Sequence, residues 1–200
     1  FVYHMRASGQ TTVLDALNEQ VENSYTNRFL LPLNDRWQEQ VDTCSRWEAP
    51  PVKSQASFYA EYVHPFIRTG NKVVVVISDA LRYEAGEELL RTIRQEDRYE
   101  ATIEPVLSML PSFTQLGMEA LLPHETLGLS KDGVALVDGA PVQGLDARKS
   151  ILSQALSGKG TAIRADDLLA LNRDDSRALM RDASVIYVYH NRIDAVGDRR

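Results

Sequence analysis

The chain has 200 residues, 44% of them hydrophobic and 25% charged, which suits a soluble globular protein with one sizeable core and argues against disorder. Its formal net charge of -6 argues against a surface that coats nucleic acid electrostatically, although a local basic groove is compatible with that sum. The longest apolar run falls well short of the ~20 residues that a membrane span needs, and the single cysteine, Cys44, favours a reducing cytoplasm because it can form neither an intrachain disulfide nor a zinc-binding cluster.

Up to residue 70 the sequence predicts helices. Apolar residues recur at helical spacing from Val13 to Tyr25 and again from Trp37 to Cys44, which we interpret as helical hairpins with Cys44 packed as a small hydrophobic side chain. After a proline-containing break, residues 58–70 predict a short helix that ends at Gly70, where a left-handed backbone suits glycine. Residues 1–70 are therefore assigned to a helical segment.

From residue 71 onward, predicted strands and helices alternate. Strands are expected at residues 72–78, 101–106, 161–165 and 184–190, and helices at residues 80–93 and 112–122 and around Leu168. This alternation predicts an α/β fold with a mostly parallel sheet that helices cover on both faces. The Asp138-Gly139 pair lies between two short apolar runs and predicts a hairpin with a type I′ turn.

Asp79 directly follows the apolar run that ends at Ser78. A carboxylate there could hold a metal ion, because the carboxyl edge of a parallel sheet is where α/β folds keep their ligand sites. It could instead cap the next helix, a position that both Ser and Asp favour, and the segment taken alone favours the cap.

The segment "LPSFTQLGMEALLP" contains a second candidate, Thr114. Ser112 and Gln115 stand in the relation of a capping box, which places Thr114 in the first helical turn, where free backbone N–H groups suit a phosphate. The alternative is that these residues merely start a helix whose apolar face is Leu116, Leu121 and Leu122.

The segment "SVIYVYHNRIDAVGD" is the third candidate. Gly197 predicts a tight turn that would bring the carboxylates of Asp194 and Asp198 toward one point, as a divalent cation requires, and a solvated turn is the alternative. His190 is open to three readings: a metal ligand, a partner of a ligand, or a capped imidazole at a strand end.

Together the segments "VVVVISDALRYE", "LPSFTQLGMEALLP" and "VIYVYHNRIDAVGD" resemble the PglZ family of BREX phage-resistance systems, a branch of the alkaline phosphatase superfamily. The resemblance covers about Phe58 to Arg200. It implies an α/β sandwich whose strand ends bind two divalent metal ions and whose Ser or Thr nucleophile accepts a phosphoryl group. In this resemblance Asp79 matches the first metal-binding Asp.

By the same resemblance Thr114 is the nucleophile and a metal ligand, because "PSFT" is similar to the Pro-x-x-Thr of the nucleotide pyrophosphatase branch. Asp194 and Asp198 fall on the superfamily's Asp-x-x-Gly-His element, written "DAVGD" here. Asp198 thus replaces the usual His, and an oxygen ligand shifts the preference from zinc toward manganese or magnesium without excluding zinc.

The superfamily's later Asp-His pair has no counterpart before Arg200. We therefore interpret residues 71–200 as the N-terminal part of an alkaline phosphatase-like domain in a longer protein, and we expect this piece to be inactive by itself.

The resemblance implies a cytoplasmic, metal-dependent phosphohydrolase or phosphodiesterase that acts on nucleotides or nucleic-acid ends. Its expected partners are other BREX proteins, and no membrane association is expected. The two metals would lower the pKa of the Thr114 hydroxyl, whose oxygen attacks phosphorus in line. The alternative is a catalytically altered assembly module that keeps the fold and mediates protein contacts in the defence complex.

Overall fold

The computed structural model describes residues 7–9 and 11–197. The chain divides into two compact units, residues 1–47 and 48–200. The second unit therefore begins before residue 70, where the sequence placed the boundary. The reason is packing: Val63 is fully buried in the core of the second unit, and Phe58 and Ile67 pack against the same cluster.

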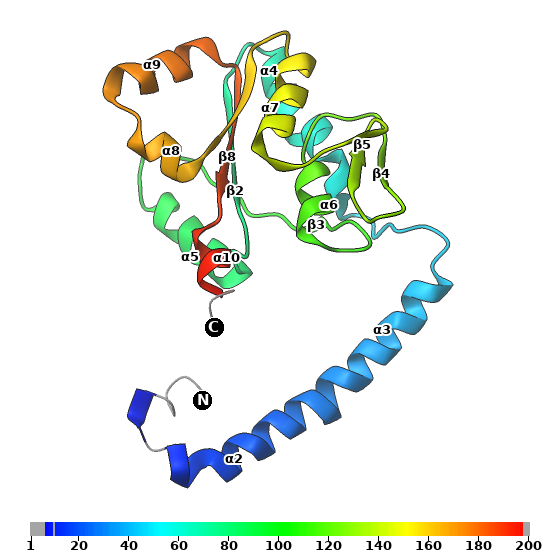
Figure 1. The fold of residues 1–200 in the computed structure, drawn as a ribbon. Coiled ribbons are helices and arrows are strands. Elements are labelled where there is room, and N and C mark those ends of the chain that lie inside the picture. Colours follow the sequence, from blue (N-terminus) through cyan, green and yellow to red (C-terminus); the bar gives the residue numbers. More distant parts are fainter. Residues whose placement is uncertain (1–6, 10, 198–200) are drawn as a thin grey trace. The chain divides into compact units, whose positions relative to one another are not determined.

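The first unit is helical. It contains α2 (Thr11–Asn23), the π-helix η1 (Ser24–Leu30) and α3 (Leu31–Thr43). The residues at both junctions, Asn23 and Leu30, have right-handed helical backbone angles, so the elements follow one another without a turn, as Figure 1 shows. The expected helical hairpins are therefore wrong. Cys44 is exposed rather than packed, and its thiol donates a hydrogen bond of 2.7 Å to the carbonyl oxygen of Arg46.

The second unit is built on a parallel sheet of three strands in the order β2-β8-β7. The strands are β2 (Val73–Ser78), β8 (Val185–His190) and β7 (Gly160–Arg164). Val75 and Ala162 both align with Tyr187 of the central strand. The run from Val185 to Val188 is buried, as a central parallel strand of β-branched and aromatic residues requires. The predicted α/β fold with a parallel sheet is confirmed.

Helices cover both faces of this sheet (Figure 1). On one face Leu152 of α7 (Gly144–Ala155) packs in a cluster with Val75 and Tyr187. On the other, α8 (Ala165–Ala170) and α9 (Arg173–Asp182) pack against Ile186 and Val188. The sequence predicted α8 but neither α7 nor α9. None of the helices in the described ranges is long and apolar enough to cross a membrane.

Smaller elements surround the sheet. They are β1 (Lys53–Ser54), η2 (Gln55–Ser57), η3 (Tyr59–Val63), α4 (His64–Arg68), β3 (Val106–Leu107), β4 (Leu127–Leu129), β5 (Ala135–Val137) and β6 (Ala140–Pro141). β3 pairs with β1 in a separate sheet, so the expected strand at residues 101–106 does not join the main sheet. Positive φ angles of 50° at Asp138 and 80° at Gly139 agree with the predicted type I′ turn.

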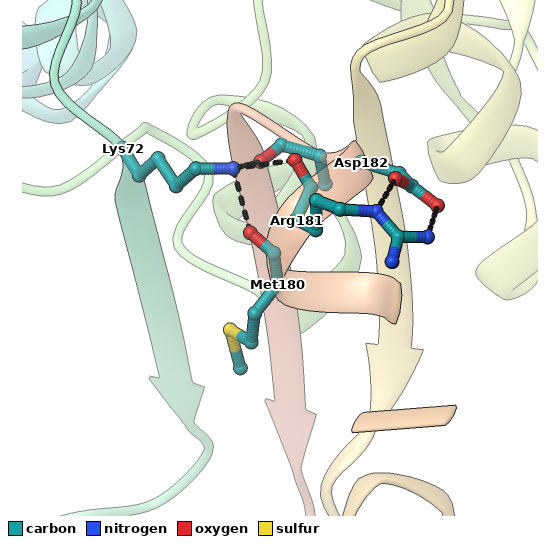
Figure 2. Close-up of polar contacts among 5 residues, drawn as sticks. Lys72, Met180, Arg181 and Asp182 are labelled. Carbon is teal, nitrogen blue, oxygen red and sulfur yellow. Dashed lines mark hydrogen bonds and ion pairs between the residues drawn. The ribbon is translucent and has the colours of Figure 1, made fainter. Parts of the chain in front are cut away.

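Lys72 ties the end of α9 to the strand at the edge of the sheet. Its Nζ donates to the carbonyl oxygens of Met180, Arg181 and Ala183, at 2.6, 2.8 and 2.8 Å, as Figure 2 shows. These carbonyls lie at or just beyond the last turn of α9, where the helix dipole favours a cation. The lysine thereby fixes α9 beside the start of β2.

Candidate functional site

Asp79 is the first residue after β2, at the carboxyl edge of the sheet. Its backbone N–H donates to the carbonyl oxygen of His190 at 3.0 Å, which extends the pairing of β2 and β8 by one bond. Its Oδ1 accepts a bond of 3.0 Å from the N–H of Ala80, which has a positive φ of 59°. The next helix, α5 (Tyr83–Arg94), begins after Arg82. The capping role that the sequence favoured is therefore wrong, and Asp79 belongs to the strand end.

Thr114 is the first residue of α6 (Thr114–Glu119), and its side chain is exposed. The residue before the helix is Phe113, and the helix start has no side-chain cap, so the predicted capping box is wrong. Gln115 instead donates from Nε2 to the carbonyl oxygen of Val142 at 3.0 Å. The first-turn position of Thr114 is confirmed, in a helix shorter than the expected residues 112–122.

Asp194 lies in the first turn of α10 (Arg192–Gly197), a short helix that follows β8. The N–H of Ala195 donates to the carbonyl oxygen of Asn191 at 3.0 Å, as in a helical turn. Gly197 therefore lies in a helix, where the sequence predicted a tight turn. Asp194 is half-buried, and Asp198 lies outside the described residues.

A pocket of about 730 Å³ brings together Asp79, Thr114 and Asp194, which come from the end of β2, the start of α6 and the first turn of α10. His190 also lines it, and its Nδ1 is hydrogen-bonded to Ser78 Oγ at 2.9 Å, so a neighbouring strand fixes the orientation of the imidazole. The three sequence-predicted residues that the structure describes therefore share one cavity at the carboxyl edge of the sheet.

Three arginines that the sequence did not indicate also line the pocket: Arg148, Arg164 and Arg192. Arg164 is the last residue of β7 and Arg192 is the first residue of α10, so their positions at strand ends were a usable signal. Arg192 pairs with Asp166 at 2.6 Å, and both side chains are exposed. Arg148 carried no local signal, because it comes from α7, a helix that the sequence did not predict.

Arg148, which lines the pocket, forms a buried ion pair with Glu119. Glu119 Oε1 accepts a hydrogen bond of 2.9 Å from Nε of Arg148, and Nη2 lies 2.9 Å from the same oxygen in the ion pair. Burial raises the pKa of Glu119 above its ordinary value, although the adjacent guanidinium acts in the opposite direction. The guanidinium carbon lies 4.8 Å from the centre of the Tyr189 ring, and burial raises the pKa of that tyrosine as well.

The donor chemistry of the pocket fits a hard divalent cation. Asp79 and Asp194 offer carboxylates and Thr114 offers a hydroxyl, which are the oxygen ligands that manganese and magnesium prefer. Within residues 7–9 and 11–197, however, no group of three or more His, Cys, Asp and Glu side chains is placed to hold a metal ion. The described residues therefore fit such an ion in donor type and supply only part of a ligand shell.

Residues 58–200 match the family model of the BREX system PglZ alkaline phosphatase-like domain. The chain is 41% identical over 193 residues to the alkaline phosphatase-like protein BrxZ of Escherichia coli O9:H4 (strain HS), with 93% of this chain and 22% of that protein covered. It is 36% identical over 185 residues to the alkaline phosphatase-like protein PglZ of Bacillus cereus (strain H3081.97), with 92% and 22% covered. The chain thus spans about a fifth of the length of these relatives. No solved structure matches it significantly.

Proposed function

The chain belongs to the PglZ family, the alkaline phosphatase-like domains of BREX systems, and from this premise we propose that the natural protein is a metal-dependent phosphohydrolase or phosphodiesterase with Thr114 as its nucleophile. The observation that carries the proposal is the shared pocket of Asp79, Thr114 and Asp194. A pair of carboxylates and a hydroxyl at the carboxyl edge of a parallel sheet is a suitable set for phosphoryl transfer.

The chain's own residues would act as follows. The Thr114 oxygen forms a bond to phosphorus while the bond from phosphorus to the leaving group breaks, and water later cleaves the threonine ester. Thr114 is exposed, so its hydroxyl proton can pass to solvent and water can reach the ester. A divalent cation held by Asp79 and Asp194 would supply positive charge that lowers the pKa of a nearby hydroxyl and offsets phosphoryl charge.

Ser78 and His190 would support this site from the sheet. Their bond of 2.9 Å joins the last residues of β2 and β8, and it holds the two strand ends beside which Asp79 and Asp194 lie. A rigid sheet edge of this kind keeps donors from three separate elements at fixed separations, which an ion and a phosphoryl group both require.

The proposal has three further parts, and the family's description as a BREX domain supports the first of them. The natural protein would act with other BREX proteins in the cytoplasm, in phage defence. Its substrates would be nucleotides or nucleic-acid ends, since both carry phosphoryl groups. Its cofactors would be two divalent metal ions, and the hard carboxylates of Asp79 and Asp194 shift the preference from zinc toward manganese or magnesium without excluding zinc.

The second candidate function is an assembly module that keeps the fold without turnover. It is favoured by Asp198, which stands in the sequence where the superfamily's motif has a His. Such a module would need the surface of the unit but not a loaded pocket.

The test is an assay of metal content and turnover on the natural full-length protein, purified, stripped with chelator and reloaded with zinc, manganese or magnesium. The proposal predicts hydrolysis of a nitrophenyl phosphate mono- or diester that the chelator abolishes and one of these metals restores. A folded protein that binds other BREX proteins and turns over neither ester with any metal would support the assembly module instead.

A further inference from the structure

Arg148, which lines the pocket, forms an ion pair with Glu119 behind it, and the two side chains are 12% and 0% exposed. The ion pair joins α7 to the end of α6, the helix that begins with Thr114. Arg148 itself lines the pocket together with Thr114 and Tyr189. Arg148 is therefore a charged residue in the same pocket as the proposed nucleophile.

Helix packing alone does not account for this pair. Removing two charges from water is costly, and well-packed apolar residues of similar size hold helices together as well or better. The cost is only partly offset here, because Glu119 Oε2 is buried and has no hydrogen-bond partner among the described residues. An apolar pair would avoid this penalty, so a charge at this position needs another explanation.

Glu119 and Tyr189 fix the guanidinium of Arg148, a residue that also lines the pocket. Glu119 engages Nε and Nη2 through a single oxygen, and the Tyr189 ring lies against the guanidinium. Nη1 takes no part in the ion pair. A planar guanidinium that is held through two of its nitrogens is suited to donate hydrogen bonds from its remaining N–H groups to an anionic oxygen.

The other two arginines of the pocket lack this support. Arg192 is exposed and forms an ion pair with the exposed Asp166. Arg164 is exposed as well. Among the arginines that line this pocket, Arg148 is thus the one whose charge is shielded from water. Electrostatic attraction to a ligand is strongest where solvent screening is weakest.

We propose that Arg148 binds a non-bridging oxygen of the substrate's phosphoryl group and that Glu119 is the positioning residue that holds its guanidinium toward the pocket. The inference rests on the proposed function of the same pocket, and it adds the group that recognises the phosphoryl anion. Arg148 attracts the anion, while Glu119 keeps the pair neutral before the substrate arrives.

The experiment measures the binding of inorganic phosphate to the natural full-length protein by calorimetry, with and without manganese. Arg148→Lys keeps the charge but loses the planar fork, so the Kd for phosphate should rise by about 10-fold. Glu119→Gln keeps an acceptor oxygen and should raise it less. Arg177→Lys is the matched control, because Arg177 is an exposed residue of α9 that pairs only weakly with Asp174, at 4.0 Å.

A double variant separates recognition from packing. Glu119→Leu with Arg148→Met replaces the ion pair by apolar side chains, which should leave the melting temperature within a few degrees of wild type. Our inference predicts that this folded variant loses phosphate binding. If it binds phosphate like wild type, Arg148 only packs α7 against α6 and the inference is overturned.

Failure of the inference and failure of the proposed function give different results. If the wild-type protein hydrolyses the ester but the Arg148 variants bind phosphate as tightly as wild type, the inference alone is overturned. If the Arg148 variants lose phosphate binding but the wild-type protein hydrolyses no ester with zinc, manganese or magnesium, the proposed hydrolase is overturned and the inference stands. A wild-type protein that binds no phosphate would overturn the inference.

Discussion

Replacing Thr114 by Ala separates a nucleophile from a residue that merely begins a helix. Thr114 is exposed at the first position of α6, and the start of that helix has no side-chain cap. Loss of its hydroxyl and methyl groups therefore removes little packing, and alanine favours a helix more than threonine does. The free energy of unfolding should change by no more than about 0.5 kcal/mol.

Turnover should respond very differently. Without the threonine oxygen the covalent route is lost, so kcat in the natural full-length protein should fall by ~10³-fold or more, while metal content stays unchanged. Thr114→Ser should retain part of the activity. Ser112→Ala is the matched control, because Ser112 is exposed and does not cap α6. The nucleophile assignment is refuted if Thr114→Ala turns over substrate within a few-fold of wild type, or if Ser112→Ala is the inactive variant.

Three further predictions test the fold and the site. Gly160→Ala should destabilise the second unit by ~3 kcal/mol or more in denaturant unfolding, because its Cβ would overlap the Leu152 carbonyl and lie 2.6 Å from Leu156 Cδ1. Gly128→Ala, with nothing within 4 Å of its Cβ, should stay within ~0.5 kcal/mol of wild type, and equal effects would contradict this packing. Asp194→Asn should lower metal affinity by ~10-fold without a change in melting temperature, and unchanged metal content after dialysis would remove Asp194 from the site. Lys72→Met should cost about 1 kcal/mol of unfolding free energy, since three carbonyls near the end of α9 lose a charged donor, and an unchanged denaturation midpoint would show that the contact is dispensable.

The parts of the fold that sequence could predict are those with strong local signals. β2 and β8 are continuous apolar runs, and the type I′ turn at Asp138-Gly139 is set by its own two residues. By contrast, α9 is polar along most of its length, so only a few apolar residues mark its buried side. Its start still had a local signal in Asn172, whose side chain accepts from the N–H groups of Asp174 and Asp175.

The candidate site divides in the same way. Asp79 follows an apolar strand run and Thr114 precedes an apolar helix face, so their positions in the chain were readable. The role of Gln115 was not, because its side chain bonds to Val142 of a distant segment instead of the helix start. The Arg148 and Glu119 pair likewise joins two helices through tertiary packing, which no local pattern records.

The most direct measurement of the central claim is to find where the phosphoryl group goes. Full-length protein with its metal would be mixed with a phosphate ester, quenched in acid within one turnover, digested and analysed by mass spectrometry. The account predicts one phosphoryl or nucleotidyl group on the peptide that contains Thr114, and none in Thr114→Ala. The account would be contradicted if the protein turned over the ester with the phosphoryl group attached to another residue. It would also be contradicted if no covalent adduct were found under conditions that capture the first turnover.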